Sequence, residues 1–250
     1  MNRKVLIDSP PKRIVSLVPS QTELLFYLGL GDQVVGRTKF CIHPADQVKV
    51  VTKVGGTKQY HLDKIAELQP DLIIGNKEEN DKAQIEALAE LYPVWMSDIK
   101  NLTDAYEMIE SIGSITNTAD KALQLNKDIQ SRFRQLASIP KDKKVAYFIW
   151  QKPYMVAATD TFIDHLLSQA GFINAFAHLE RYPEIELEEL VRLAPDLILL
   201  SSEPFPFKQK HLDFFQNECP NADVQLVDGE LFSWYGNRLL HSAGYFLSLH

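Results

Sequence analysis

Two residues in the first half of the chain have the side chains and the spacing to bind a metal. Cys41 and His43 lie in the stretch FCIHP, and a thiolate and an imidazole are ligands that transition metals accept. Two ligands do not complete a site, and no second cluster has a matching spacing. Three interpretations therefore stay open: a metal site at Cys41 and His43, a polar pair at the edge of a cleft, or a buried cysteine beside a loop histidine.

The stretch FSWYGNRLLH near the C-terminus gathers groups suited to a flat ligand. Trp234 and Tyr235 offer large aromatic surfaces, and Arg238 offers a planar fork that pairs with carboxylates or phosphates. The structural alternative is an aromatic core in which Arg238 forms a salt bridge to Glu230 or Glu203. The sequence alone does not choose between a binding surface and a core.

Composition and motifs exclude several classes of protein. The 250 residues are 45% hydrophobic and carry a net charge of -7, which argues against a nucleic-acid partner. No apolar run approaches the ~20 residues that span a bilayer. The chain has no phosphate-binding GxxxxGK[ST] loop, no GxGxxG fingerprint and no HExxH motif. We therefore expect a binding protein rather than an enzyme.

The elements that would position these residues are encoded twice. LDKIAELQPDLII at residues 62–74 matches LEELVRLAPDLIL at residues 187–199, with an offset of 125 residues throughout. In each copy, apolar residues at helical spacing precede Pro-Asp, and a short apolar strand follows. Strands that alternate with helices predict parallel sheets covered on both faces. We expect two Rossmann-like α/β lobes, residues 1–101 and 140–250.

Residues 102–139 lie between the predicted lobes and carry a helical pattern. Apolar residues recur on one face through TDAYEMIESIGSIT and again through ADKALQLNKDIQSRF, and no Gly/Ser/Pro-rich linker is present. The pattern predicts one long interdomain helix, with Gly113 as the point where it could break. A stiff helix of this kind would limit the movement of the lobes.

This organisation resembles the helical-backbone class of periplasmic binding proteins, which deliver cobalamin, haem and iron-siderophore complexes to ABC importers. The resemblance covers nearly the whole chain and is carried by PKRIVSLVPSQTELLFYLGLGDQVVG, VGGTKQYHLDKIAELQPDLIIGN and YPEIELEELVRLAPDLILLSS. The first segment is most similar to cobalamin-binding members. Those members have tryptophans where this chain has Thr57 and Asn76. The resemblance implies a ligand held between the lobes and an ABC permease as partner.

Loops at the carboxyl ends of parallel strands form the ligand sites of α/β folds, and here these loops are rich in aromatic residues. Tyr182 stands where the cobalamin-binding members have a ligand-facing tryptophan, and Arg238 occupies the position of a family arginine. The ligand contacts expected from the loops and the resemblance are Phe40, Thr57, Tyr60, Asn76, Trp150, Tyr182, Trp234, Tyr235 and Arg238.

Two acidic residues occupy equivalent positions in the two copies of the repeat. Asp63 and Glu188 each open a predicted helix, where negative charge is favoured, and this alone explains both. In the resembled class, acidic residues at these positions dock onto arginines of a two-fold permease. Helix stabilisation and permease docking are therefore both kept as interpretations.

Three functions follow from these expectations. The first is a monomeric solute-binding protein that captures a corrinoid, haem or ferric siderophore for an ABC importer and needs no cofactor of its own. The second is a cytoplasmic cofactor-binding or salvage protein of the same fold, because the N-terminal residues contain no secretory signal. The third is a metal-dependent enzyme built on Cys41 and His43. The resemblance favours a periplasmic or cell-surface location over a cytoplasmic one.

Overall fold

The computed structural model describes residues 5, 7 and 9–250, which form two compact units. The first lobe contains the described residues through Ile99 together with Thr103–Asp128 and Tyr235–Asn237. The second lobe contains Lys100–Leu102, Ile129–Trp234 and Arg238–His250. Every helix among the described residues is too short or too polar to cross a membrane.

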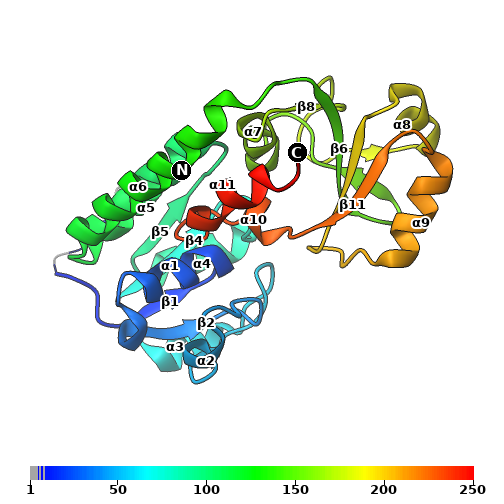
Figure 1. The fold of residues 1–250 in the computed structure, drawn as a ribbon. Helices are drawn as coiled ribbons and strands as arrows, with labels where there is room; N and C mark the ends of the chain where they lie inside the picture. The colour runs from blue at the N-terminus through cyan, green and yellow to red at the C-terminus, as the bar shows by residue number, and fades with distance from the viewer. Residues whose placement is uncertain (1–4, 6, 8) are drawn as a thin grey trace. The chain divides into compact units, whose positions relative to one another are not determined.

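The first lobe is built on a parallel five-stranded sheet, as the sequence predicts (Figure 1). Its order is β3-β2-β1-β4-β5, with β1 at Ile14–Ser16, β2 at Val34–Arg37, β3 at Thr52–Lys53, β4 at Leu72–Asn76 and β5 at Val94–Ser97. Every residue of the two central strands β1 and β4 is buried. Strands buried on both faces need continuous apolar runs, which is why RIVSL and DLIIG show no alternation.

Helices cover this sheet and supply its core. They are α1 at Pro19–Tyr27, the 3-10 turn η1 at Gly31–Gln33, α2 at Ala45–Val48, α3 at Leu62–Leu68 and α4 at Lys82–Leu91. Val15 and Ile73 of the sheet pack with Ile65 of α3 and Ile85 of α4 in one apolar cluster.

The second lobe has a mixed sheet, and here the expectation of purely parallel strands is wrong in part. Its order is β11-β10-β6-β7-β9, and β8 pairs with β6. The strands are β6 at Lys143–Trp150, β7 at Tyr154–Val156, β8 at Phe172–Asn174, β9 at Glu184–Ile185, β10 at Leu197–Ser201 and β11 at Asp223–Val227. Strand β7 runs antiparallel to β6 and β9. The short link between β6 and β7 explains this, because a parallel crossover needs a dozen residues or more.

The helices of the second lobe follow the same pattern as those of the first. They are η2 at Arg134–Ser138, α7 at Phe162–Gln169, α8 at Leu187–Leu193, α9 at Gln209–Glu218, α10 at Glu230–Ser233 and α11 at Leu239–Leu247. Phe148 of β6 and Leu200 of β10 pack with Leu190 of α8 and Phe215 of α9. Tyr147 and Leu199, which alternate with these strand residues, are also buried, so helices and loops cover both faces.

The repeated Pro-Asp marks more than the end of a helix. Helices α3 and α8 both end at a left-handed residue, Gln69 and Ala194, each with φ 44°. The carboxylate of Asp71 then accepts hydrogen bonds from the backbone N–H groups of residues 12 and 13, at 2.7 and 2.9 Å. The carboxylate of Asp196 accepts one from the N–H of residue 144, at 2.7 Å. Each aspartate thus ties the strand that follows it to the first strand of its own lobe.

The segment between the predicted lobes is a helical hairpin, so the prediction of one long joining helix is wrong. Helices α5 (Leu102–Ile115) and α6 (Ala119–Phe133) lie side by side (Figure 1), and the Asn126 amide donates to the Tyr106 carbonyl at 3.0 Å. The chain turns at residues 116–118, where Asn117 has φ 58°. Gly113 does not break α5. A Cβ there would lie 2.4 Å from that of Ala122, so glycine lets the two helices approach closely.

Candidate functional site

In the first lobe, the loops after β2 and β3 enclose a cavity of about 570 Å³. Two predicted ligand contacts, Phe40 and Thr57, both line it. The Phe40 side chain is 49% exposed, and the Lys39 ammonium lies 4.9 Å from the centre of its ring. Phe40 therefore presents an accessible aromatic face, as expected from the sequence. The described lining residues are Lys39, Phe40, Lys53, Gly55, Gly56, Thr57, Lys58, Gln59, His61 and Lys64.

Tyr60 supports this cavity from beneath rather than lining it. Its ring belongs to the core of the first lobe and is 6% exposed. Its hydroxyl donates to the Thr57 carbonyl at 2.5 Å, and burial raises the pKa of the hydroxyl, which stays protonated. The Asn80 amide donates to the same carbonyl at 3.1 Å. Tyr60, expected to contact a ligand, instead holds the loop that contains Thr57.

Further contacts fix the loop after β3. The Gln84 side chain donates to the Lys58 carbonyl at 2.6 Å and accepts from the Tyr60 N–H at 2.8 Å. Gly55 has φ 128°, and a Cβ there would lie 2.4 Å from the Gln59 carbonyl oxygen. Because only glycine fits this backbone without strain, the wall of the cavity has a preset shape.

Asn76 is placed as a loop-shaping residue at the end of β4. It is 1% exposed, and its side-chain oxygen accepts from the N–H groups of Glu78 and Glu79 at 2.8 and 3.2 Å. Its amide nitrogen donates to the Ser97 hydroxyl at 3.0 Å. Both ends of the amide are engaged inside the lobe, a common use of asparagine directly after a strand. The geometry does not present Asn76 to a ligand.

The environment of Cys41 favours the buried-cysteine interpretation over the metal site. Its sulfur is 0% exposed and lies 3.1 Å from the hydroxyl oxygens of both Thr22 and Thr38. Burial raises the pKa of the thiol, and the thiolate is the form that binds metals. Within the part of the chain that the structure describes, no three histidine, cysteine or acidic residues are grouped to hold an ion. Cys41 and His43 therefore belong to no such group.

In the second lobe, Trp150 ends β6 and is 39% exposed. Its ring packs edge-on against Phe205, with centroids 5.6 Å apart and an interplanar angle of 66°. Phe205 lies in the loop after β10 and rests in turn on the buried Phe207, at 4.8 Å. These rings form an aromatic surface at the carboxyl ends of β6 and β10. Phe205 was not among the contacts selected from the sequence.

Tyr182 is half-buried and precedes strand β9. The Arg181 guanidinium lies 5.6 Å from the centre of its ring, and Arg181 also pairs with the Asp160 carboxylate at 3.5 Å. A cation held over a tyrosine ring orders both side chains. The structure therefore gives Tyr182 an ordered position beside Arg181.

Trp234 is held in a buried network of the second lobe. It is only 7% exposed, and its indole N–H donates to a carboxylate oxygen of Glu203 at 2.8 Å. The Ser233 hydroxyl donates to the same oxygen at 2.6 Å. Burial raises the pKa of Glu203, hydrogen bonds from Ser233 and Trp234 oppose this, and the nearby Glu230 raises it further. Glu203 is a functional candidate that the sequence pointed to only as a salt-bridge partner.

Arg238 packs over the ring of Trp234. Its guanidinium carbon lies 4.9 Å from the ring centre of Trp234, and its Nη1 lies 2.8 Å from the Glu230 carboxylate. The side chains of Arg238 and Glu230 are 15% and 17% exposed. The structural alternative, a salt bridge from Arg238 to Glu230, is thereby confirmed. Tyr235 is 6% exposed and is assigned by its contacts to the first lobe, whereas Trp234 and Arg238 are assigned to the second.

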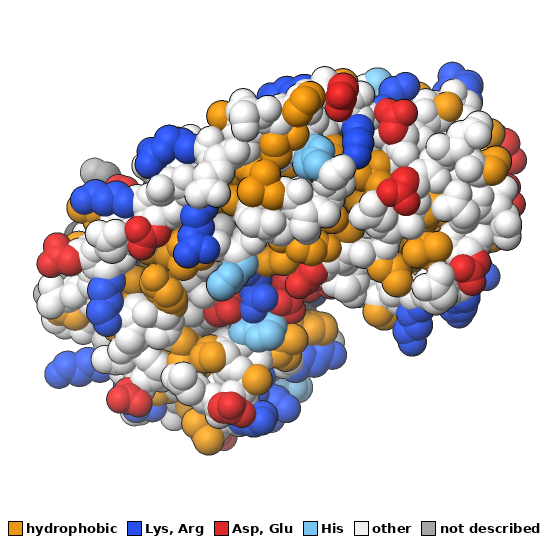
Figure 2. Space-filling view, in the orientation of Figure 1, with side chains coloured by type: hydrophobic (Ala, Val, Ile, Leu, Met, Phe, Trp, Pro, Cys, Tyr) orange, Lys and Arg blue, Asp and Glu red, His pale blue; other side chains and the backbone are white. Residues whose placement is uncertain are grey.

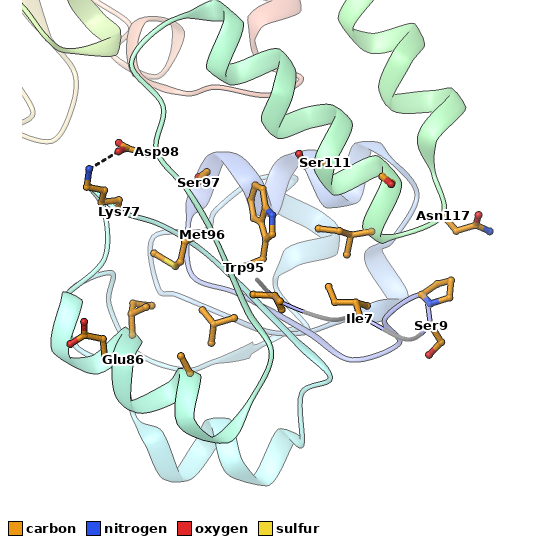
Figure 3. A pocket seen from close by; sticks show the side chains of 17 residues that line it. Ile7, Ser9, Lys77, Glu86, Trp95, Met96, Ser97, Asp98, Ser111 and Asn117 are labelled. Carbon is orange, nitrogen blue, oxygen red and sulfur yellow. Dashed lines mark hydrogen bonds and ion pairs between the residues drawn. The ribbon is translucent and has the colours of Figure 1, made fainter. Parts of the chain in front are cut away.

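A second cavity of the first lobe, of about 1170 Å³, lies along β5 between α4 and α5 (Figure 3). The indole of Trp95 extends from β5 toward α5, and Lys77 pairs with Asp98 at 2.6 Å near one end. None of the ligand contacts predicted from the sequence lines this cavity. Its lining carries both signs of charge, since Glu86 and Asp98 face it together with Lys77.

Asp63 and Glu188 are both exposed, in the first turns of α3 and α8. These two helices are each seven residues long and match in sequence position, so the repeat places the two carboxylates alike in their own lobes. Exposure leaves both available to a partner. The choice between helix stabilisation and permease docking stays a prediction.

Comparison with known proteins identifies a family and relatives for this chain. The profile of a family described as periplasmic binding protein matches residues 14–221. YvrC of Bacillus subtilis (strain 168), named as an uncharacterized ABC transporter substrate-binding lipoprotein, is 33% identical over 96% of this chain and 80% of its own length. The vitamin B12-binding protein of Vibrio parahaemolyticus is 26% identical over 78% of this chain and 73% of its own length.

A solved structure supports the fold. The periplasmic haem-binding protein of Pseudomonas aeruginosa matches with a TM-score of 0.84 and 22% identity, over 96% of this chain and 92% of that chain. Fold, family profile and the relative from Bacillus subtilis all point the same way, and the resemblance seen in the sequence is confirmed. The chain belongs to the periplasmic binding protein family.

Proposed function

We propose that this chain is a solute-binding protein that captures a metal chelate or a corrinoid-type ligand and delivers it to an ABC permease. The observation that carries the proposal is an exposed aromatic ring at strand ends in each lobe, Phe40 in the first and Trp150 in the second. Flat rings bury much ligand surface while little rotamer entropy is lost. Relatives named for vitamin B12 and haem binding support this choice of ligand class.

The proposed role needs neither catalysis nor a cofactor of the chain's own. The corrinoid, haem or ferric chelate is the cargo, and a single copy of the chain suffices to bind it. Relatives named as a lipoprotein and as periplasmic proteins support a role outside the cytoplasm. The relatives from Bacillus subtilis and Vibrio parahaemolyticus are named as binding proteins, which supports a carrier rather than an enzyme.

A ligand screen tests the proposal. Cyanocobalamin, cobinamide, haemin and ferric siderophores are added to the purified chain, and the melting temperature and tryptophan fluorescence are measured. A ligand that binds the native state raises the melting temperature with the logarithm of its concentration above the dissociation constant. Absence of any shift across the whole panel would contradict the proposed ligand class.

Variants of the exposed rings sharpen this test. Phe40→Ala and Trp150→Ala are expected to weaken binding of the ligand found in the screen by about ten- to a hundredfold, because each removes a rigid aromatic contact. Tyr27→Ala and Leu226→Ala are matched controls, since Tyr27 is 45% and Leu226 is 42% exposed in the same respective lobes. Equal losses in the controls and the test variants would argue against a role of these rings.

Docking to the permease is the second part of the proposal. We infer that the exposed carboxylates of Asp63 and Glu188 contact the permease, because the repeat presents them alike on α3 and α8. Asp63→Lys with Glu188→Lys should abolish ligand-stimulated ATP hydrolysis by the permease and leave ligand affinity unchanged. Glu67→Lys with Glu218→Lys is the control pair. Intact stimulation by the first pair would remove the docking role.

A further inference from the structure

The first-lobe cavity that Phe40 lines differs in charge from the rest of the chain. The chain has 26 basic and 33 acidic side chains, a net charge of -7. The described lining of this cavity nevertheless contains four lysines and a histidine, and no aspartate or glutamate. On the face shown in Figure 2, acidic and basic side chains are intermixed rather than gathered by sign. The cationic lining is therefore a local feature.

The four lysines reach the cavity from separate elements. Lys39 follows β2, Lys53 is the last residue of β3, Lys58 lies in the next loop and Lys64 lies on α3. Two neighbouring parallel strands thus end at the same edge of the sheet, the edge where α/β folds bind ligands. Convergence of like charges from these four elements is unfavourable unless an anion offsets it.

These ammonium groups have no carboxylate partner within the described residues. Lys58 donates to the Glu78 backbone carbonyl at 2.6 Å, and Lys39 lies over the Phe40 ring. Other lysines of the same lobe behave differently, since Lys77 pairs with Asp98 at 2.6 Å and Lys82 with Glu86 at 3.8 Å. The cavity therefore gathers lysines that no carboxylate of the described residues neutralises, and their charge is available to an external anion.

The size of the cavity and the order of its wall also suit a ligand. Its volume of about 570 Å³ suits part or all of a small molecule. The loop from Gly55 to Tyr60 is held by the contacts of Asn80 and Gln84 described above. A wall that is already ordered loses little entropy when a ligand binds. The lysine side chains are exposed, whereas hydrogen bonds hold the backbone loop between them.

We propose that this cavity binds an anionic oxygen group of the ligand, a carboxylate or an equivalent anion, and that the protein therefore selects negatively charged metal chelates. Phe40 supplies the apolar contact, and Lys39, Lys53, Lys58 and Lys64 supply the charge. The selection of chelates rests on the proposed function, whereas the anion site is a property of the first lobe alone.

Ferric chelates that share the metal and differ in charge provide the test. Ferric dicitrate is negatively charged, ferrichrome is uncharged and ferrioxamine B is positively charged. Dissociation constants are measured by titration calorimetry with the full chain at low and high salt, and citrate without metal is titrated separately. We expect affinity to fall in the order given, and binding of ferric dicitrate and of citrate to weaken with salt because exposed charges are screened.

Lysine variants link the selection to the cavity. Lys53→Gln with Lys64→Gln should weaken ferric dicitrate and citrate binding by about tenfold, a size typical of two exposed ion contacts. Ferrichrome binding should stay unchanged. Lys82→Gln with Lys127→Gln removes the same charge from exposed positions of the first lobe outside the cavity and should have no effect. Melting temperatures confirm that each variant folds.

The outcomes separate the two levels of the proposal. Equal affinity for ferrichrome and ferric dicitrate, with no effect of the lysine variants, overturns the anion site and leaves the proposed function standing. Lysine-dependent binding of citrate, without binding of any chelate, corrinoid or haemin, supports the anion site and contradicts the proposed function. If neither citrate nor ferric dicitrate binds at low salt, the anion site is wrong.

Discussion

The two copies of the repeat share a backbone and differ in charge. Helices α3 and α8 have the same length, end at the same left-handed geometry and are followed by an aspartate that ties two strands together. At the offset of 125 residues, Lys53 and Lys64 of the first half correspond in number to His178 and Glu189 of the second. The first pair lines a cationic cavity, whereas His178 and Glu189 bond to each other at 3.0 Å.

This difference separates two kinds of information in one repeated sequence. The residues that end helices and join strands are kept in both copies, because each lobe needs the same elements. The residues that border the strand-end loops differ, and the residue found 125 positions after Thr57 is Tyr182. The architecture is therefore duplicated, and the chemistry that a ligand meets is not.

Removal of the shared aspartates should have the largest effect. Asp71→Ala and Asp196→Ala are each expected to lower the free energy of unfolding by about 1.5–3 kcal/mol, because backbone N–H groups lose a charged acceptor. Asp71 accepts two such bonds and Asp196 one, so Asp71→Ala should cost more. Urea unfolding measures both, with the exposed Asp46→Ala as control. A loss of stability at only one of the two positions would show that the two aspartates do not have the same structural role.

Gly55 tests the part of the first copy that the second lacks. Gly55→Ala is expected to lower the free energy of unfolding by about 2 kcal/mol, because φ 128° is strained for alanine and its Cβ meets the Gln59 carbonyl. The residue 125 positions later is Glu180, which does not have a positive φ. Gly244→Ala in α11 is the control, since nothing lies within 4 Å of the added carbon. It should be neutral or slightly stabilising.

A charge exchange at one repeat position should have a smaller effect on stability. Lys64→Glu should weaken citrate binding while the free energy of unfolding changes by less than about 0.5 kcal/mol, because Lys64 is exposed. Glu189→Lys should leave citrate binding unchanged and cost about 0.5–1 kcal/mol, because it breaks the contacts with His178 and Arg192. Calorimetry and urea unfolding of both variants measure this. If Glu189→Lys weakened citrate binding and Lys64→Glu did not, the first-lobe lysine would not be the residue that binds the anion.

The sequence predicted the parts of the fold that depend on local patterns. The repeat and the parallel sheet of the first lobe could both be read from apolar spacing and from Pro-Asp. The hairpin of α5 and α6 was missed because the apolar pattern recurs on both sides of the turn and therefore predicts one continuous helix, with Gly113 as its only expected weak point. Whether Gly113 instead lets a neighbouring helix approach depends on Ala122, which periodicity does not reveal.

The candidate site was harder to predict for a similar reason. An aromatic residue after a strand can face a ligand or the core, and its type does not distinguish them. Phe40 and Trp150 are exposed, whereas Tyr60 and Trp234 have partners that bury them, Thr57 and Glu203. The lysines of the first-lobe cavity are spread over 26 positions from Lys39 to Lys64, so only the fold brings them together.

The smallest predicted effect concerns Glu203, a buried carboxylate of the second lobe. Its pKa is raised in the folded state, chiefly by burial and further by Glu230 and Asp228. As pH rises, the unfolded chain ionises this group first, at its ordinary pKa, and the folded chain ionises it only at higher pH. The free energy of unfolding should therefore fall as pH rises through that interval. The measurement is urea unfolding from pH 4 to 8.

Glu203→Gln isolates this contribution. Ser233 and Trp234 both donate to a single oxygen of Glu203, and the side-chain oxygen of glutamine can accept both bonds. The variant should match the wild-type chain at acidic pH and be slightly more stable at neutral pH, because it has no charge to bury. Glu203→Leu, which loses both acceptor contacts, should be less stable by about 1–3 kcal/mol at every pH. If Glu203→Gln and the wild-type chain show the same dependence on pH, the carboxylate is not the group that titrates.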